Sequence, residues 1–158
     1  AIMVGMLFVQ PIIGLLSGCA TPAGRGSSAT ITYEVDGQQK TTAFTPSNVT
    51  CNDRGAVSLS FPDKPFNGVS LSRGSTDTVE AWVYGDELIF FTSESVTVTQ
   101  ATDDGATTYV VSGQAGEVAV AALAQGSPDT PPDVDAAISN AVRYAGRLDF
   151  TLRCDPES

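Results

Sequence analysis

Alternation of apolar and polar residues is the feature that most constrains the fold of this 158-residue chain. Ile31, Tyr33 and Val35 alternate with threonine and glutamate, and the same period returns in short runs as far as residues 148–154. A period of two places the apolar side chains on one face of a strand. We therefore predict a mainly β (α+β) fold, built as a single antiparallel β-sandwich-like or curved-sheet domain.

Turn residues divide the chain into many short strands. Asp36-Gly37 predicts a tight hairpin, and Gly85-Asp86 and Asp103-Asp104-Gly105 separate later runs. Pro62 and Pro65 end the strand before them, because proline cannot donate into a ladder. The strands are expected within residues 31–35, 38–45, 49–51, 57–61, 69–71, 79–84, 88–92, 96–98, 109–112 and 148–154. Along these runs Val49 shares a face with Cys51, and Val57, Leu59 and Phe61 continue the pattern.

One helix is expected before the last strand. Asp133 is a suitable N-cap, Asp135 and Arg143 suit the two ends of the helix dipole, and Gly146 can terminate the helix. The apolar positions at helical spacing are Val134, Ala137, Ile138, Ala141, Val142 and Ala145. This predicts one C-terminal-half helix, at residues 134–145, whose flat alanine and valine face packs on the sheet.

The N-terminal segment differs in composition from the rest of the chain. Residues 2–16 are almost wholly apolar, and they lead into Leu16-Ser17-Gly18-Cys19, which resembles a bacterial lipobox. We expect residues 1–18 to be a signal peptide without its basic start, residues 19–28 a lipidated flexible tether, and residues 29–158 one globular domain. The alternative is a retained membrane anchor, but the run is shorter than the ~20 residues a span needs, and Pro11 interrupts it.

Lipid on Cys19 accounts for membrane attachment. A diacylglyceryl thioether with an N-linked acyl chain such as palmitate supplies the two or more chains that stable anchoring requires. The following residues, 20–29, are rich in Gly, Ser, Thr, Ala and Pro, which is typical of a flexible tether. We therefore expect an exported protein anchored to the outer face of the cytoplasmic membrane or cell envelope.

The charge of the chain excludes two classes of partner. The net charge of -10 opposes binding to nucleic acid, because phosphate recognition needs clustered Lys and Arg. It also opposes a charge-driven grip on anionic lipid. The membrane contact is therefore expected to come from the lipid on Cys19 alone.

The chain has three cysteines, an odd number for an exported protein. If lipid occupies Cys19, then Cys51 and Cys154 remain to form a disulfide outside the cytoplasm. The alternation places both side chains on the inner faces of their strands. Free buried thiols are the alternative.

Several segments together resemble the mycobacterial 19 kDa lipoprotein antigen family of actinobacterial surface lipoproteins. The matching segments are residues 16–19, 35–37, 49–51, 55–59, 109–115 and 150–154. The resemblance implies a lipid-anchored surface protein with a β-rich domain and one disulfide, carried here onto Cys19, Cys51 and Cys154. Two departures are a shorter tether and the segment 113–116, which is shorter than the family's Gly-Thr-Ala-Thr-Gly and is expected to reshape a surface loop.

The residues give no support for catalysis. The chain has no histidine, which removes the commonest general base and transition-metal ligand. Asp103-Asp104-Gly105 is a hairpin turn, while Asp129, Asp133 and Asp135 lack the glycine and final glutamate of a calcium loop. We therefore predict no enzyme activity, no metal and no cofactor.

An aromatic cluster is the one candidate binding surface. Trp82, Tyr84, Phe90 and Phe91 fall on two neighbouring strands across the Gly85-Asp86 turn. Core packing explains most of the cluster, but consecutive residues of a strand point to opposite faces. One of Phe90 and Phe91 is therefore expected to be exposed or covered by the helix, and an exposed one marks a partner or lipid surface.

These features predict a non-enzymatic, monomeric surface lipoprotein that acts as an antigen-like interaction protein with a protein partner at the cell surface. One alternative is a carrier of lipid or another small molecule, with an apolar cavity between sheet and helix. A second alternative is a phage or prophage lipoprotein that interferes with infection.

Overall fold

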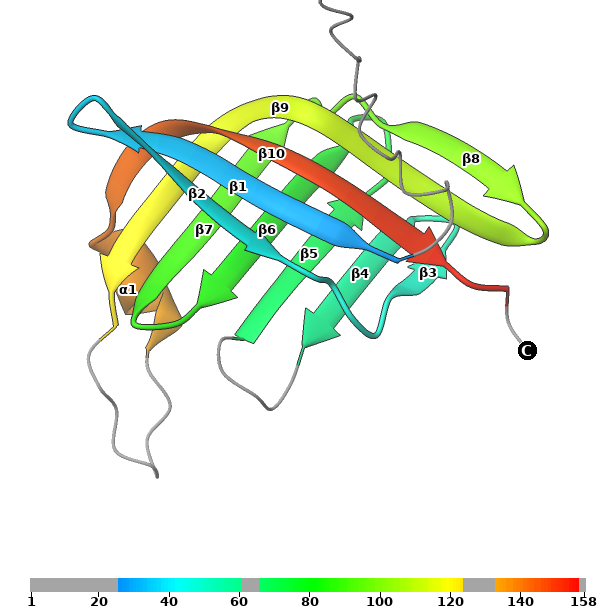
Figure 1. The fold of residues 1–158 in the computed structure, drawn as a ribbon, viewed down its shortest axis with the longest axis horizontal. Coiled ribbons are helices and arrows are strands. Elements are labelled where there is room, and N and C mark those ends of the chain that lie inside the picture. The colour runs from blue at the N-terminus through cyan, green and yellow to red at the C-terminus, as the bar shows by residue number, and fades with distance from the viewer. Residues whose placement is uncertain (1–25, 61–65, 124–132, 157–158) are drawn as a thin grey trace, which may run out of the picture.

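The computed structural model describes residues 26–60, 66–123 and 133–156 of the chain. These residues form ten strands and one short helix, α1 (Val134–Ser139). The strands are β1 (Ser28–Val35), β2 (Gln38–Phe44), β3 (Thr50–Asn52), β4 (Gly55–Ser60), β5 (Phe66–Ser72), β6 (Thr78–Tyr84), β7 (Glu87–Glu94), β8 (Thr99–Asp103), β9 (Ala106–Ala122) and β10 (Val142–Cys154). Figure 1 shows their arrangement.

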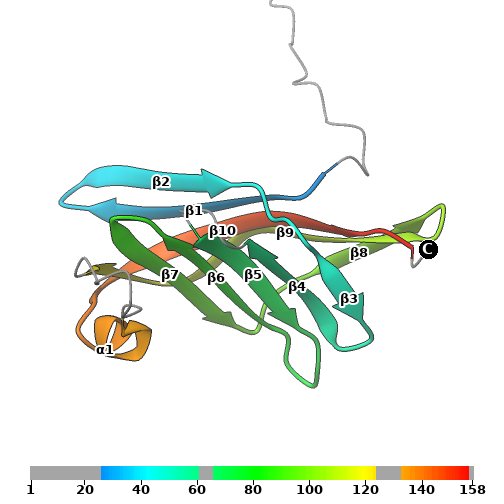
Figure 2. The same ribbon diagram turned by 90° about the horizontal axis from the view of Figure 1, so that it is seen from below.

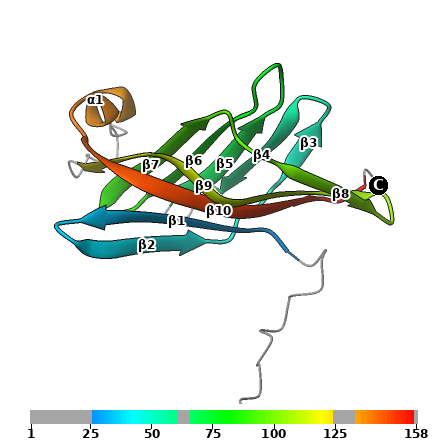
Figure 3. The ribbon, with the colours of Figure 1, turned by 90° about the horizontal axis from the view of Figure 1, so that it is seen from above.

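All ten strands belong to one antiparallel sheet that curls on itself. Its order is β2-β1-β10-β9-β7-β6-β5-β4-β3, and β8 pairs with β9 off this path. Figures 2 and 3 show that β1, β2 and β10 form one wall, the first wall, and that β3 to β7 form the other, the second wall. The prediction of a mainly β curved sheet with a single helix is confirmed.

The long strand β9 joins the two walls. One edge pairs with β10 along most of its length, while the other edge pairs first with β8 and then with β7. The register with β10 shifts between Leu148 and Phe150, which places a bulge in β9. Gly113 lies there at φ 57°, and its N–H donates to Asp149 Oδ1 at 2.7 Å. Because a bulge bends a strand, β9 can leave β8 and continue along β7.

The inner faces of the two walls form one apolar core. Ile31 of β1, Leu148 of β10, Phe91 of β7 and Leu71 of β5 are almost wholly buried in a single cluster. Their alternation with less buried residues is the reason that each strand contributes one face to this cluster. Burial of each such side chain stabilises the fold by about 1.5–3 kcal/mol relative to exposure.

A disulfide closes the curl. Cys51 in the edge strand β3 is bonded to Cys154 at the end of β10, with 5.9 Å between the Cα atoms. In the order of the sheet, β9, β7, β6, β5 and β4 lie between these strands. An edge strand can reach β10 only because the sheet bends back on itself. The predicted Cys51–Cys154 pairing is therefore confirmed.

The predicted helix is wrong beyond Ser139. Asp133 does cap it, since its Oδ1 accepts from Ala136 N at 3.0 Å, but Asn140 follows as the C-cap. Residues 142–145, expected to continue the helix, pair with residues 117–120 of β9. Val142 and Ala145 fit either structure locally, and the long-range ladder with β9 decides for the strand.

Several strands differ in extent from the prediction. The run expected at 109–112 is part of the 17-residue strand β9, and the segment 113–116 lies within that strand rather than in a surface loop. The run expected at 96–98 precedes β8, although Val96 itself is buried. Strand β1 begins at Ser28, one residue before the expected domain boundary.

Strand β4 faces the opposite way from what its apolar residues suggest. Ser58 is wholly buried, and its Oγ accepts from Val69 N at 3.1 Å, whereas Val57 and Leu59 are exposed. The pairing of Ala56 with Leu71 fixes this orientation, because it places Ala56 and Ser58 beside the core-facing residues of β5. Position Phe61 of the expected run lies outside the described residues.

The adjacent phenylalanines give a direct test of the two faces. We expect Phe91→Ala to lower the free energy of unfolding by about 3–5 kcal/mol, because it empties a fully buried site. Phe90→Ala is expected to cost about 1–2 kcal/mol, because Phe90 is only partly buried. Urea unfolding of both variants measures the difference. Equal losses would contradict the assignment of the two side chains to opposite faces.

The disulfide gives a second prediction. The double variant Cys51→Ala/Cys154→Ala is expected to lose about 2–5 kcal/mol of stability, because the bond closes a segment with a sequence separation of 103. Unfolding in urea, with and without reductant, measures this loss. Cys19→Ser serves as the control and should leave the stability unchanged. Two alkylatable thiols at positions 51 and 154 in the oxidised protein would contradict the pairing.

Candidate interaction surface

The outer face of the second wall carries an aromatic row. The register aligns Leu59 of β4, Gly68 of β5, Trp82 of β6 and Phe90 of β7 side by side across the sheet. Trp82 and Phe90 are partly buried, and Leu59 is 41% exposed. We call Trp82 and Phe90, together with the aliphatic Leu59 in the same row, the outer aromatic row.

Phe91 does not belong to this surface. It is fully buried in the core and pairs with Ala81 and Val118, which face the same interior. Of the four aromatic residues proposed from the sequence, Trp82, Tyr84 and Phe90 therefore share the outer face. The inclusion of Phe91 was wrong because the strand alternation separates it from its neighbour.

Gly68 allows the tryptophan to lie against β5. A Cβ at position 68 would come within 2.6 Å of Cε2 of Trp82 and within 2.7 Å of the carbonyl oxygen of Ser58. Only the absence of a side chain leaves room for the indole over the backbone. The strand pairing and this contact thus place the indole against the backbone of β5, in one row with Leu59 and Phe90.

Helix α1 borders the surface on one side. It contacts β7 and β9, where Leu88, Ala119 and Ala121 are buried on the outer face. Burial raises the pKa of Tyr84, and the nearby carboxylate of Asp135 in α1 raises it further. The Tyr84 ring also meets Phe66 edge-on, with 6.4 Å between the ring centroids.

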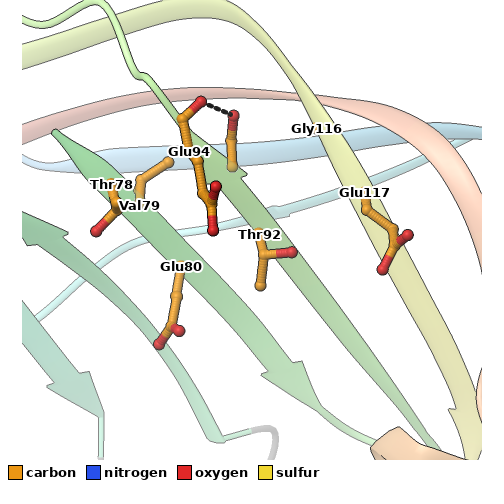
Figure 4. A pocket seen from close by; sticks show the side chains of 8 residues that line it. Thr78, Val79, Glu80, Thr92, Glu94, Gly116 and Glu117 are labelled. Carbon is orange, nitrogen blue, oxygen red and sulfur yellow. Dashed lines mark hydrogen bonds between the residues drawn. The ribbon is translucent and has the colours of Figure 1, made fainter. Parts of the chain in front are cut away.

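A hollow lined by glutamates lies beside the aromatic row. It has a volume of about 630 Å³. Figure 4 shows Glu80 on β6, Thr92 and Glu94 on β7, and Glu117 on β9 around it. The register aligns Glu80, Thr92 and Glu117 across three strands. We call this space the glutamate hollow.

Arg143 is the cation that approaches the hollow. Its guanidinium pairs with Glu117 and also donates to the carbonyl of Ile138 at 3.4 Å. The sequence predicted that Arg143 would serve the C-terminal end of the helix from within it. The arginine instead reaches a carbonyl in the last turn of α1 from β10.

A second hollow lies near the start of β1. It has a volume of about 600 Å³ and is lined in part by Gly26, Asn48, Arg153 and Asp155. The lining of both hollows is mainly polar, unlike the apolar cavity that binds a lipid or a drug-sized ligand. Neither hollow favours a carrier function.

The predicted lipidation motif, Leu16, Ser17, Gly18 and Cys19, lies outside the described residues. Among the residues that the structure does describe, no three His, Cys, Asp or Glu side chains are placed to hold a metal ion. That part of the chain also contains no helix with the length and apolarity that a membrane span requires.

Sequence reasoning missed Val57, Leu59 and the glutamates of the hollow as parts of a surface. Leucine and valine in an alternating run are normally buried, and scattered glutamates normally mark a solvated face. The signal available in the sequence was Ala56 and Ser58, whose small side chains fit a tightly packed interior. Only the register joins the glutamates into one hollow.

Protein-family models, curated proteins and solved structures yield no match for this chain.

The contact between Gly68 and Trp82 gives a testable prediction. We expect Gly68→Ala to lower the free energy of unfolding by about 1–3 kcal/mol, because the added methyl group forces the indole off the sheet. Trp82 fluorescence should also shift to the red as the ring gains contact with water. Gly74→Ala is a matched control, since its Cβ would meet nothing closer than 3.7 Å. An unchanged emission spectrum in Gly68→Ala would contradict the packing.

Proposed function

We propose that this chain is a lipid-anchored, non-enzymatic interaction protein of the bacterial cell envelope, exposed on the outer face of the cytoplasmic membrane. Lipid on Cys19 would hold it there, and the domain would meet its partner outside the cell. The resemblance of several segments to actinobacterial surface lipoproteins agrees with this location.

The use of the cysteines is the observation that carries the proposal. The disulfide takes Cys51 and Cys154, which leaves Cys19 as the third cysteine of the chain. Cys19 follows Leu16-Ser17-Gly18 and an apolar run, as the acceptor of a lipidation signal does. A structural disulfide also fits an oxidising location outside the cytoplasm. Both arguments support export.

The position of the first strand supports an orientation of the domain on the membrane. Arg153 N donates to Ser27 Oγ at 3.0 Å, so the chain enters β1 beside the end of β10. Figures 1 to 3 place α1 at the opposite end of the long axis. The segment from Cys19 to Gly26 spans at most about 25 Å. The domain would therefore sit close to the bilayer with α1 pointing away.

The chemistry of the domain favours binding over catalysis. The chain has no histidine, and the outer aromatic row offers tryptophan and phenylalanine, residues typical of protein interfaces. The row lies on the wall whose outer face α1 borders. This wall is the part of the domain that we propose meets a partner.

Replacing the lipidated cysteine tests the anchoring. With the chain expressed behind a start codon and a basic leader in a bacterial host, Cys19→Ser should move the protein from the membrane to the soluble fraction. Incorporation of an alkyne-labelled fatty acid should also be lost, because the thiol acceptor is absent. Fractionation and in-gel labelling measure the two effects.

The double variant Cys51→Ala/Cys154→Ala is the matched control and should keep both the label and the membrane association. Membrane association of Cys19→Ser equal to that of the unaltered chain would refute the proposed lipid anchor.

A further inference from the structure

We propose that the outer face of β4 to β7 binds an extended segment of a partner protein that carries an apolar residue and a Lys or Arg two positions apart. The inference deepens the proposed interaction function by naming the chemistry of the partner. The outer aromatic row would receive the apolar residue, and the glutamate hollow would receive the cation.

The apolar half of the site lies on the outer face of β4 to β7, and part of it is exposed to solvent. Leu59 is 41% exposed on the outer face of β4, in the row of Trp82. The next positions across the sheet from Leu59 are Gly68, then Trp82, whose ring lies against Gly68, and then Phe90. Tryptophan in a supported, partly desolvated position is the side chain that most often dominates binding energy. The row thus offers a preformed apolar anchor.

The acidic half lies directly beside it on the same strands. Glu80 is two residues before Trp82 on β6, and Glu117 is two residues before Ala119, which pairs with Phe90. Glu94 lines the same hollow, and Arg143 is the cation paired with Glu117. Three carboxylates with one paired arginine leave this space negative, so a Lys or Arg of a partner is the complementary group.

The spacing of the two halves selects an extended ligand. Side chains two residues apart on a strand point to the same face and are separated by about 7 Å. The step from Glu80 to Trp82 has this length, and so does the step between residues i and i+2 of an extended peptide. An extended peptide lying along β6 can therefore place a cation and an apolar side chain on both halves together.

The charge of the protein disfavours a second copy and an anionic membrane as occupants of this face. A second copy bound face to face would place two sets of these glutamates in one interface, because a two-fold contact uses the same patch on both copies. An anionic membrane would be repelled by the same carboxylates and by the net charge of -10. A cationic and apolar segment of another protein is the occupant that both halves accept.

The single tryptophan makes the proposal directly measurable. Trp82 is the only tryptophan of the chain, so its fluorescence reports this surface alone. The full chain with Cys19→Ser is titrated with a synthetic peptide that repeats leucine, serine, lysine and serine. We expect saturable binding with a blue shift of the Trp82 emission. Because this variant cannot be lipidated, the result does not depend on whether the anchoring proposal holds.

Two matched peptides separate the two contributions. Replacing each lysine of the probe by glutamate should abolish binding, and replacing each leucine by serine should weaken it at least about tenfold. The double variant Glu80→Gln/Glu117→Gln should weaken the leucine-lysine peptide about five- to tenfold at low salt and flatten the dependence on salt. Leu59→Ser should weaken it by a similar factor.

Two control variants make the same kinds of substitution, one apolar and one acidic, at positions outside the proposed binding face. Val142→Ser removes a residue that is 58% exposed and pairs with Val120 on the opposite face of the sheet, and Glu34→Gln removes a carboxylate from β1. Both should leave the affinity unchanged. Equal binding of the leucine-free peptide, or equal losses in these controls, would overturn the proposal. A shift of Trp82 emission caused by neutral lipid vesicles, or by protein concentration alone, would also overturn it in favour of a membrane or a second copy.

Discussion

The curl of one sheet around its own apolar face is the constraint on which the rest of the structure depends. Strand β9 is long enough to pair with β10 on one edge and with β8 and β7 in turn on the other. The bulge at Gly113 bends it, and the Cys51–Cys154 bond ties the edge strand back to β10. Each wall thus buries the inner face of the other, and no second sheet is required.

This arrangement decides where the protein can meet other molecules. The inner faces fill one another with Ile31, Phe91, Leu148 and their neighbours, so the interior is occupied by the core. Within residues 26–60, 66–123 and 133–156, the outer faces and edges of the sheet therefore remain for binding. On the outer face of the second wall, the glutamate hollow and the outer aromatic row adjoin, since Glu80 and Trp82 are two residues apart on β6. Acidic and apolar side chains thus lie next to each other on the same strands.

The predictions that succeeded depend on neighbours in sequence. The Asp36-Gly37 turn joins β1 to β2, and Asp104-Gly105 joins β8 to β9, with positive φ at each of these residues. The predictions that failed depend on pairing across the sheet. Residues 142–145 had a pattern that suits a helix, but their ladder with β9 makes them a strand. The aromatic cluster was found from sequence, while the glutamates beside it were not.

By itself, the sequence determined the strand period, the turns, the cysteine count and the resemblance of residues 16–19 to a lipobox, because these depend on residue types at short spacing. Only the tertiary structure decided which side of each strand faces inward. In β4, the small residues Ala56 and Ser58 are inside and Leu59 is outside, and of the two adjacent phenylalanines Phe91 is buried while Phe90 faces outward. Alternation defines the two faces of a strand but does not show which of them is buried. The register with the neighbouring strands determines the buried face.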